Sequence, residues 1–220
     1  MNAKQIAMAR ASKRFMKLVI LRVPLWLVYA LGFIPAIWYF YLGVIDELGA
    51  DPMKTLERAL GLWALRFLVA CLTITPLRQS FGINLLRFRR QIGLLAFYYA
   101  MLHLTVYLVL DQGLDVSAIV ADIVKRPYIT IGMTAFTLLV PLAVTSNNTS
   151  VRHLGARLWS RLHKLVYVAI AFAAVHFLLV VKAWPLEPMA YAAIVAALLL
   201  YRALKALPSR PAPAAVQRPA

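Results

Sequence analysis

Apolar residues along the chain are grouped into long blocks that are separated by short polar segments. A bilayer core of about 30 Å is crossed by about 20 helical residues, and six blocks approach or exceed that length. They cover residues 24–45, 56–77, 91–110, 128–145, 163–181 and 188–201. The pattern predicts an all-α integral membrane protein, a bundle of six transmembrane helices. Arg66 interrupts the second block, and the sixth block is short.

Composition supports a membrane protein. Of the 220 residues, 63% are hydrophobic and 15% are charged, whereas soluble domains are about 45–50% apolar and about 25% charged. A soluble core of this length could not bury so much apolar surface, and disordered chains are poor in hydrophobic residues. The single cysteine, Cys71, excludes a disulfide within the chain and a cysteine-based metal site.

The sequence predicts one membrane domain with a tail at each end. The expected parts are a basic tail over residues 1–22, the helical domain over 23–207, and a disordered tail rich in Pro, Ala and Arg over 208–220. The first apolar block is longer than the apolar region of a signal peptide, so it is expected to be a retained span. The segments between the blocks are too short to form a soluble domain.

The distribution of charge predicts the direction of the spans. The chain has 24 Lys and Arg residues against 8 Asp and Glu residues. If six spans alternate in direction, 18 of the 24 basic residues lie on one side and all 8 acidic residues lie on the other. Basic segments stay in the cytoplasm, so both termini are predicted to be cytoplasmic. The positive surplus therefore indicates topology rather than a nucleic-acid surface.

Ionisable residues inside the predicted spans are candidates for function because they are costly to insert. They are Arg66, His103, His163 and His176. No Asp or Glu lies in mid-membrane, which argues against a proton pump or a cation transporter. The sequence has no phosphate-binding glycine loop and no zinc-ligand spacing. His153 lies in an expected polar, basic loop over residues 145–161 and is predicted to be solvated.

His103 and His176 are predicted to lie at the same depth in the membrane. The third and fifth blocks run in the same direction, and the two histidines lie about 18 Å and about 20 Å along them at about 1.5 Å per residue. Two imidazoles at one level on separate helices are the axial ligands that a six-coordinate haem iron needs. The sequence therefore predicts a haem between the third and fifth helices.

Residues near the two histidines suit a flat macrocycle. Small residues precede each histidine by three and seven positions and would leave a slot; they are Ala96, Ala100, Ala169 and Ala173. Larger residues four positions away would wall it; they are Tyr99, Tyr107 and Phe172. A simpler interpretation also remains open, because a buried histidine can hydrogen-bond to a neighbouring helix and alanines often permit close helix packing.

The role of His163 is open on the sequence alone. It lies 13 residues before His176, which places the two about 140° apart around a straight helix. The matching level of the third block holds Arg90 and Gln91 instead of a histidine. His163 is therefore either a ligand of a second haem, whose partner is missing or is not a histidine, or an interfacial residue that hydrogen-bonds to headgroups or backbone.

Two parts of the sequence resemble a known family. The stretch LRFRRQIGLLAF over residues 86–97, followed by His103, is similar to the third-helix signature of ferric-reductase-like membrane domains. The stretches PLAVTS over 141–146 and LHKLVY over 162–167, followed by His176, resemble the same family. Within it, the chain is most similar to haem-binding subunits of periplasmic methionine sulfoxide reductase systems, over about residues 18–204.

The resemblance implies a cofactor set and an electron path. Its cofactors would be b-type haem and FMN, and its ligand residues would be His103, His163 and His176. The protein would be an electron-transfer subunit in the bacterial inner membrane rather than a catalytic subunit. Electrons would come from the quinone pool or a cytoplasmic flavin reductase. They would pass to a periplasmic molybdopterin-containing methionine sulfoxide reductase, which repairs oxidised proteins.

The chain also departs from its larger relatives, which carry two histidines in each of the two helices and an added flavin/nicotinamide domain. Here the third block has one histidine, and no length remains for such a domain. Two alternatives are therefore kept. One is a cytochrome b-type ferric or other reductase with a different acceptor. The other is a small transporter or scaffold without redox function, whose purified form would be colourless.

Overall fold

The computed structural model describes residues 22–181 and 185–206, and within these residues the regular structure is helical, without strands. The α-helices are α2 (Leu25–Val44), α3 (Pro52–Pro76), α4 (Arg89–Thr105), α5 (Val116–Lys125), α6 (Pro127–Val144), α7 (Asn148–Leu162), α8 (Leu165–Val180) and α9 (Leu186–Ala206). Short π-helical turns, η1 (Leu77–Phe81) and η3 (Val106–Asp111), continue α3 and α4, and a 3₁₀ turn, η2 (Leu86–Phe88), precedes α4. The tails predicted over 1–22 and 208–220 lie almost wholly outside the described residues.

Most of these helices are long and apolar enough to cross a membrane. Five stretches qualify singly, and they are Leu25–Val44, Pro52–Phe81, Leu86–Asp111, Pro127–Val144 and Leu186–Ala206. A sixth span is obtained when α7 and α8, which meet at a bend of 44°, are taken together. The prediction of an all-helical, multi-pass membrane protein is confirmed.

Two predicted boundaries differ from those in the structure. α3 begins at Pro52, four positions before the predicted start of the second span, because Asp51 accepts the N–H of Lys54 and proline suits the first helical position. α9 extends over Leu186–Ala206, beyond the predicted 188–201. The predicted spans were too short because they stopped at polar residues, whereas the helices continue through those residues.

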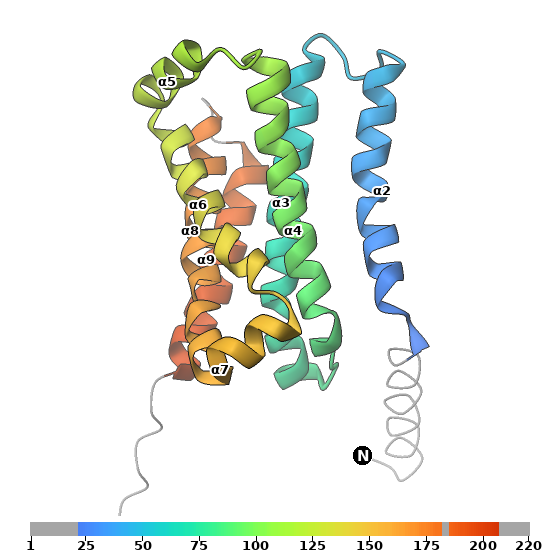
Figure 1. Ribbon diagram of the computed structural model, residues 1–220, viewed down its shortest axis with the longest axis vertical. Coiled ribbons are helices and arrows are strands. Elements are labelled where there is room, and N and C mark those ends of the chain that lie inside the picture. Colours follow the sequence, from blue (N-terminus) through green and yellow to red (C-terminus); the bar gives the residue numbers. More distant parts are fainter. Residues whose placement is uncertain (1–21, 182–184, 207–220) are drawn as a thin grey trace, which may run out of the picture.

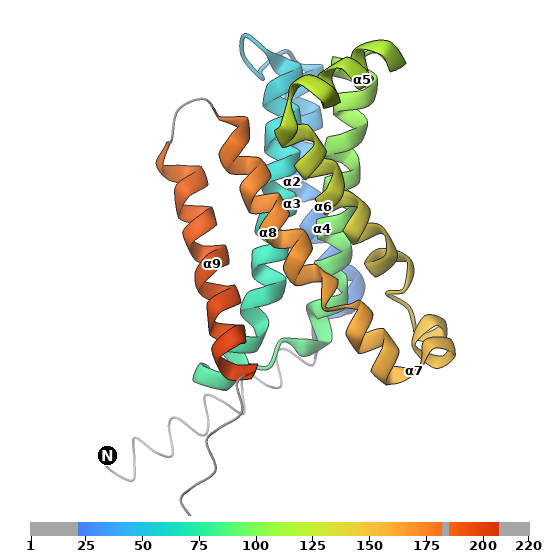
Figure 2. The same cartoon turned by 90° about the vertical axis from the view of Figure 1, so that its left-hand side faces the viewer.

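Four helices form the centre of the bundle. α3 packs most extensively against α4, and α6 packs against α8 to a similar extent. α2 lies outside α4 and α3, and α9 lies against α8 (Figures 1 and 2). Between the two central pairs the core is apolar, and its buried members include Leu65, Leu68, Leu72, Ala96, Leu139, Ala169, Ile170 and Ala174.

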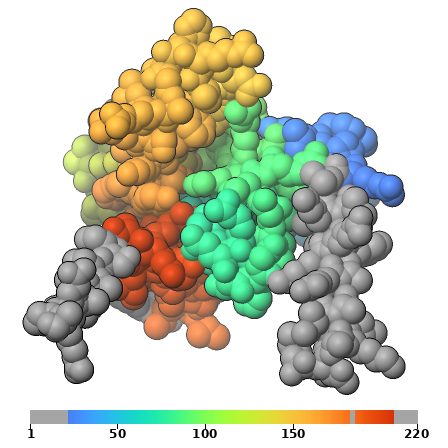
Figure 3. All heavy atoms as spheres, turned by 90° about the horizontal axis from the view of Figure 1, so that it is seen from below, coloured from blue at the N-terminus to red at the C-terminus, as the bar shows by residue number. Residues whose placement is uncertain are grey.

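Two helices occupy segments that the apolar pattern left as connections. The Asp115 side chain caps α5 by accepting the N–H groups of Ser117 and Ala118. α7 fills most of residues 145–161, where a polar loop was expected, so that expectation was wrong. Its start is capped by Asn147, and it bends at Gly155, whose φ is 73°. A charged segment is stable as a helix here because α7 lies across the end of the bundle, outside the apolar core (Figures 1 and 3).

The two ends of the bundle differ in charge. α7 lies at the end where α4 begins and α3, α6 and α9 finish, and this end is rich in arginine. The acidic residues, which are Asp46, Glu47, Asp51, Glu57, Asp111, Asp115, Asp122 and Glu187, lie at or near the opposite end together with α5. We refer to these as the basic end and the acidic end. Their identification with cytoplasm and periplasm is a prediction from charge.

Candidate functional site

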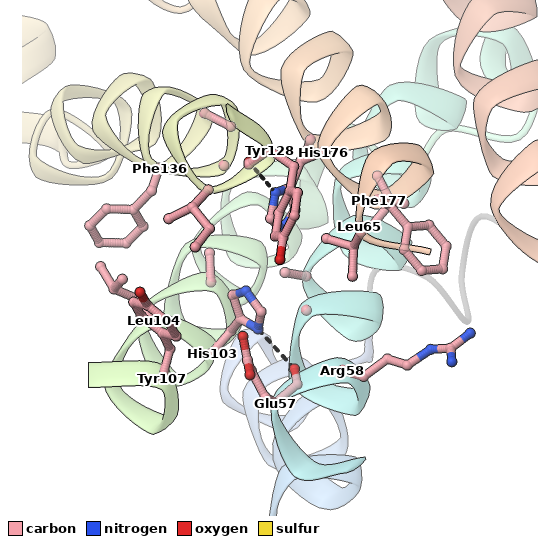
Figure 4. A pocket seen from close by; sticks show the side chains of 18 of the residues that line it. Glu57, Arg58, Leu65, His103, Leu104, Tyr107, Tyr128, Phe136, His176 and Phe177 are labelled. Atoms are coloured by element: carbon pink, nitrogen blue, oxygen red, sulfur yellow. Dashed lines mark hydrogen bonds between the residues drawn. The ribbon is translucent and has the colours of Figure 1, made fainter. Parts of the chain in front are cut away.

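His103 on α4 and His176 on α8 face each other inside the bundle. Their ring centroids are 6.2 Å apart, and the ring planes are inclined at 75°. Figure 4 shows the two rings pointing into the same space from different helices. The structure therefore brings together the two histidines that the sequence placed at one depth.

Both rings line a cavity of about 820 Å³ between α3, α4, α6 and α8, and sites for small ligands and cofactors occupy about 300–1,000 Å³. Much of its wall is apolar, including Leu65, Ala100, Leu104, Phe136, Leu139, Ala173 and Phe177. Its charged lining is confined to the acidic end, where α3 and α6 begin, and consists of Lys54, Glu57, Arg58, Asp111 and Arg126. The cavity suits a largely apolar molecule with a polar edge.

Each histidine is held by a backbone carbonyl of the helix packed against it. His103 Nδ1 lies 2.8 Å from the carbonyl oxygen of Glu57 on α3, and His176 Nδ1 lies 2.7 Å from that of Tyr128 on α6 (dashed lines in Figure 4). A carbonyl oxygen only accepts hydrogen bonds, so each Nδ1 carries the proton and donates it. In a neutral imidazole the lone pair is then on Nε2.

A glycine faces each histidine ring from one turn further along the same packing helix. A Cβ placed on Gly61 of α3 would lie 3.0 Å from His103 Nδ1. A Cβ placed on Gly132 of α6 would lie 2.7 Å from His176 Nδ1 and 2.8 Å from its Cε1. The two rings therefore occupy space that a side chain at either position would fill.

The two histidines are a donor pair that suits one haem. Two imidazoles bound to one iron by metal–nitrogen bonds of about 2 Å would have ring centroids about 6 Å apart, in agreement with the observed 6.2 Å. Each ring has Nδ1 held by a carbonyl, as metal-bound histidines commonly do. Within the described residues no group of three or more His, Cys, Asp or Glu side chains converges, so the donor set is a pair of imidazoles rather than a metal cage.

His163 lies apart from this cavity, at the junction of α7 and α8. Its ring stacks on Trp159 with centroids 3.8 Å apart, and its Nε2 lies 3.1 Å from Thr145 Oγ1. The Thr145 hydroxyl donates to the Pro141 carbonyl, so it accepts the Nε2–H of His163. The structure thus brings His163 together with neither His103 nor His176, and gives its Nε2 a different partner.

The neighbours expected around the two histidines are only partly confirmed. Ala100, Ala173 and Tyr107 line the cavity, whereas Ala96 and Ala169 are fully buried in the helix core. Tyr99 was wrongly expected to wall the slot. Its hydroxyl instead donates to Gly32 O and accepts the N–H of Ala36, both on α2.

Two further candidates have other surroundings. Arg66 donates from Nε to the Tyr191 hydroxyl at 2.9 Å, and its Cζ lies 4.8 Å from the centre of the Trp63 ring. It therefore joins α3 to α9 instead of facing the histidines. His153 is exposed on α7, as its polar surroundings predicted, although it is on a helix rather than in a loop.

Sequence reasoning missed the residues that orient the histidines. The Glu57 and Tyr128 contacts use backbone oxygens, which leave no mark on the sequence. Gly61 and Gly132 do leave one, because glycine within a membrane helix often marks a close approach to a neighbouring helix. These two glycines within the predicted spans were therefore the available signal.

The sequence is similar to characterised families. Residues 59–174 match the family described as "Ferric reductase like transmembrane component", a region that includes α4 with His103 and most of α8. Proteins named "Protein-methionine-sulfoxide reductase heme-binding subunit MsrQ" from Brucella ovis, Brucella canis and Brucella suis are also similar to it. Each is 67% identical over 178 residues, which make up 81% of this chain and 80% of the relative.

Proposed function

The chain belongs to the MsrQ family of haem-binding subunits, within the ferric reductase-like transmembrane components, and from this we propose that it carries electrons through a b-type haem held between His103 and His176. The proposed acceptor is a periplasmic molybdopterin-containing methionine sulfoxide reductase subunit, MsrP, which would repair oxidised proteins. The observation that supports this function best is the pair of opposed imidazoles, 6.2 Å apart, each with Nδ1 bonded to a carbonyl.

The chain's own residues would set the properties of the site. A bound haem supplies reversible one-electron chemistry at its iron, with a potential that depends on ligands, hydrogen bonds and burial. His103 and His176 would hold the haem iron through Nε2, the nitrogen left without a proton when Nδ1 donates to a carbonyl. The Glu57 and Tyr128 carbonyls hold the Nδ1 protons, which fixes the rings and makes them more basic ligands. The apolar walls of the cavity would limit contact of the bound group with water.

The proposed direction of transfer follows the charge of the two ends. The basic end and both termini are proposed to be cytoplasmic, and the acidic end, where the cavity has its charged lining, would face the periplasm. The domain of residues 23–207 would then span the bacterial inner membrane. A quinol from the membrane, or a cytoplasmic flavin reductase, is the proposed electron donor, with FMN as a further cofactor.

His163 is proposed to serve a second cofactor near the basic end. Its position at the start of α8, outside the cavity, supports a separate site, and arginines 89 and 90 lie on the neighbouring start of α4. Coordination by Nε2 would require the bond to Thr145 to break. The chain itself would act as an electron-transfer subunit without a catalytic residue.

The haem ligands are tested by the visible spectrum of purified protein. We expect His103→Ala and His176→Ala to lose the reduced-minus-oxidised absorption of b-type haem, because either change removes one of the two histidines that would hold it. His153→Ala is the matched control, since His153 is exposed on α7, and it should keep the spectrum. Undiminished haem in both His103→Ala and His176→Ala would refute the ligand assignment.

The acceptor is tested separately, by combining the purified chain with a reduced quinol analogue and MsrP. We expect methionine sulfoxide to be reduced only when the chain and MsrP are both present. A ferric reductase with the same haem would instead reduce iron chelates and leave methionine sulfoxide unchanged. A colourless preparation with haem supplied would favour a transporter or scaffold.

A further inference from the structure

We propose that Gly61 and Gly132 are positioning residues that hold the two histidines with their ring planes nearly perpendicular. Each glycine acts with the carbonyl four residues earlier, Glu57 or Tyr128, and we call each carbonyl and glycine together a clamp. The inference rests on the proposed haem site, and it explains how this fold fixes the orientation of each ligand.

The two clamps are built in the same way. Residues four apart in a helix lie one above the other on the same face, so the carbonyl of residue 57 and the α-carbon of Gly61 face α4 together. The same relation holds for residue 128 and Gly132 facing α8. Each carbonyl oxygen has two lone pairs, and it can accept from the histidine as well as from its own helix.

Glycine is needed in each clamp because the ring lies against the backbone. A Cβ on Gly132 would come within 2.7 Å of His176 Nδ1 and 2.8 Å of Cε1, closer than carbon atoms approach without a shift. A Cβ on Gly61 would lie 3.0 Å from His103 Nδ1 and 3.2 Å from Cε1, which is tight but less severe. A methyl group would therefore push either ring away from its carbonyl, and His176 further than His103.

Other glycines of the bundle have neighbours of a different kind. A Cβ on Gly32 of α2 would meet the Leu95 side chain, which is close helix packing without a histidine. Gly93, in the same bundle on α4, would place a Cβ 3.9 Å from Cys71 Sγ, an ordinary contact. The glycines of the clamps differ because the neighbouring atoms belong to the histidine rings themselves. They occur in the two most extensively packed helix pairs, α3 with α4 and α6 with α8.

The clamps fix an angle as well as a position. Each ring is held by a helix other than its own, so the inclination of 75° between the rings follows from how the two helix pairs are placed. Low-spin ferric haem with two imidazoles near perpendicular gives a strongly anisotropic EPR signal, whereas nearly parallel imidazoles give a rhombic signal. The clamp geometry therefore predicts the strongly anisotropic type.

The test compares Gly132→Ala, Gly61→Ala and the control Gly93→Ala by EPR and by redox titration of purified, haem-loaded protein. Wild type and Gly93→Ala should share the strongly anisotropic signal. Gly132→Ala should move it toward the rhombic type or lose the low-spin haem, and its reduction potential should shift. Gly61→Ala, with the milder contact, should show the same changes to a smaller extent and remains measurable if Gly132→Ala does not assemble.

The outcomes separate this inference from the proposed function. Haem retained in both His103→Ala and His176→Ala would overturn the function and the clamps with it. Haem that depends on both histidines, with Gly132→Ala and Gly61→Ala indistinguishable from Gly93→Ala, would overturn the clamps alone. A rhombic signal in wild type would overturn them as well.

Discussion

The paired histidines and His163 carry their ring proton on different nitrogens, so they are opposite tautomers in the same bundle. His103 and His176 donate from Nδ1 to carbonyl oxygens, so their lone pairs are on Nε2. His163 donates from Nε2 to the Thr145 hydroxyl, which itself donates to Pro141 O. In neutral His163 the lone pair is therefore on Nδ1.

The neighbouring acceptor, rather than depth in the membrane, therefore decides which nitrogen of a histidine is free to bind a ligand. A histidine on a membrane helix is a candidate ligand by residue type alone. The paired histidines meet this role because backbone carbonyls take the Nδ1 protons and leave Nε2 directed into the cavity. His163 stacks on Trp159 and uses the same nitrogen to hold α6 against α7.

The largest effect expected from this comparison is in haem content. His176→Ala should remove the haem that the pair holds, whereas His163→Ala should retain it together with its low-spin signal. Haem per protein, measured by pyridine haemochrome, and EPR on the same samples distinguish the two variants. Equal loss of that low-spin haem in both would show that His163 acts on the same site and that the contrast is wrong.

A smaller effect is expected at Thr145. Thr145→Val removes the acceptor of the His163 proton and should favour the Nδ1–H form that the paired histidines have, at a cost of about 0.5–1.5 kcal/mol in stability for the lost hydrogen bond. The ¹⁵N NMR shifts of the His163 ring report the change, and the haem spectrum should not alter.

Thr137→Val is the matched control for this change. Thr137 is also on α6 and donates to the carbonyl four residues earlier, that of Met133, but it has no histidine partner. Its substitution should leave the His163 ring signals in place. Unchanged His163 signals in Thr145→Val as well would show that Thr145 does not set the tautomer.

The smallest effect is expected in acid at the cap of α5. Hydrogen bonds from the side chain and N–H of Ser117 and from the N–H of Ala118 hold the pKa of Asp115 below its ordinary value. The cap therefore stabilises α5 fully above the ordinary aspartate pKa of about 3.9 and is lost as the pH falls through the lower folded pKa. The amide signals of Ser117 and Ala118 should move only in that acidic range.

Asp115→Asn keeps a capping oxygen but cannot titrate. Its amide signals should be independent of pH over the same range, and haem binding should be unaffected in both proteins. Titration of these amides near neutral pH in wild type would contradict the assignment to Asp115.

The sequence was sufficient to predict the spans and the meeting of His103 with His176. A long apolar block indicates a membrane span directly. Because successive spans alternate in direction, the position of a residue within its block then gives its depth in the membrane. The depth of a residue in the membrane does not determine the direction in which its side chain points around the helix axis. Tyr99 precedes His103 by one turn, about 40° around the helix, and this rotation is enough to direct its hydroxyl to α2 instead of the cavity.

Local composition also misled the prediction at α7. Residues 145–161 contain arginines, polar residues and Gly155, which together are typical of a loop. The helix forms because Asn147 caps it and because Trp159, near its end, donates to the Thr145 carbonyl and stacks on His163. The Asn147 cap is a local signal that the sequence carried. The bond from Trp159 to Thr145 reaches the end of α6 and cannot be read from a local pattern.

The arrangement of the clamps has a consequence for assembly. Each clamp contact joins residues 46 or 48 positions apart, in α3 and α4 or in α6 and α8, whereas the two histidines are 73 positions apart. Contacts between segments near in sequence form faster than those between distant segments. Each hairpin can therefore orient its own histidine as it is synthesised, and only the meeting of the two hairpins is left to complete the cavity. On this order of assembly, each histidine is already oriented by its own helix pair when the two pairs pack together.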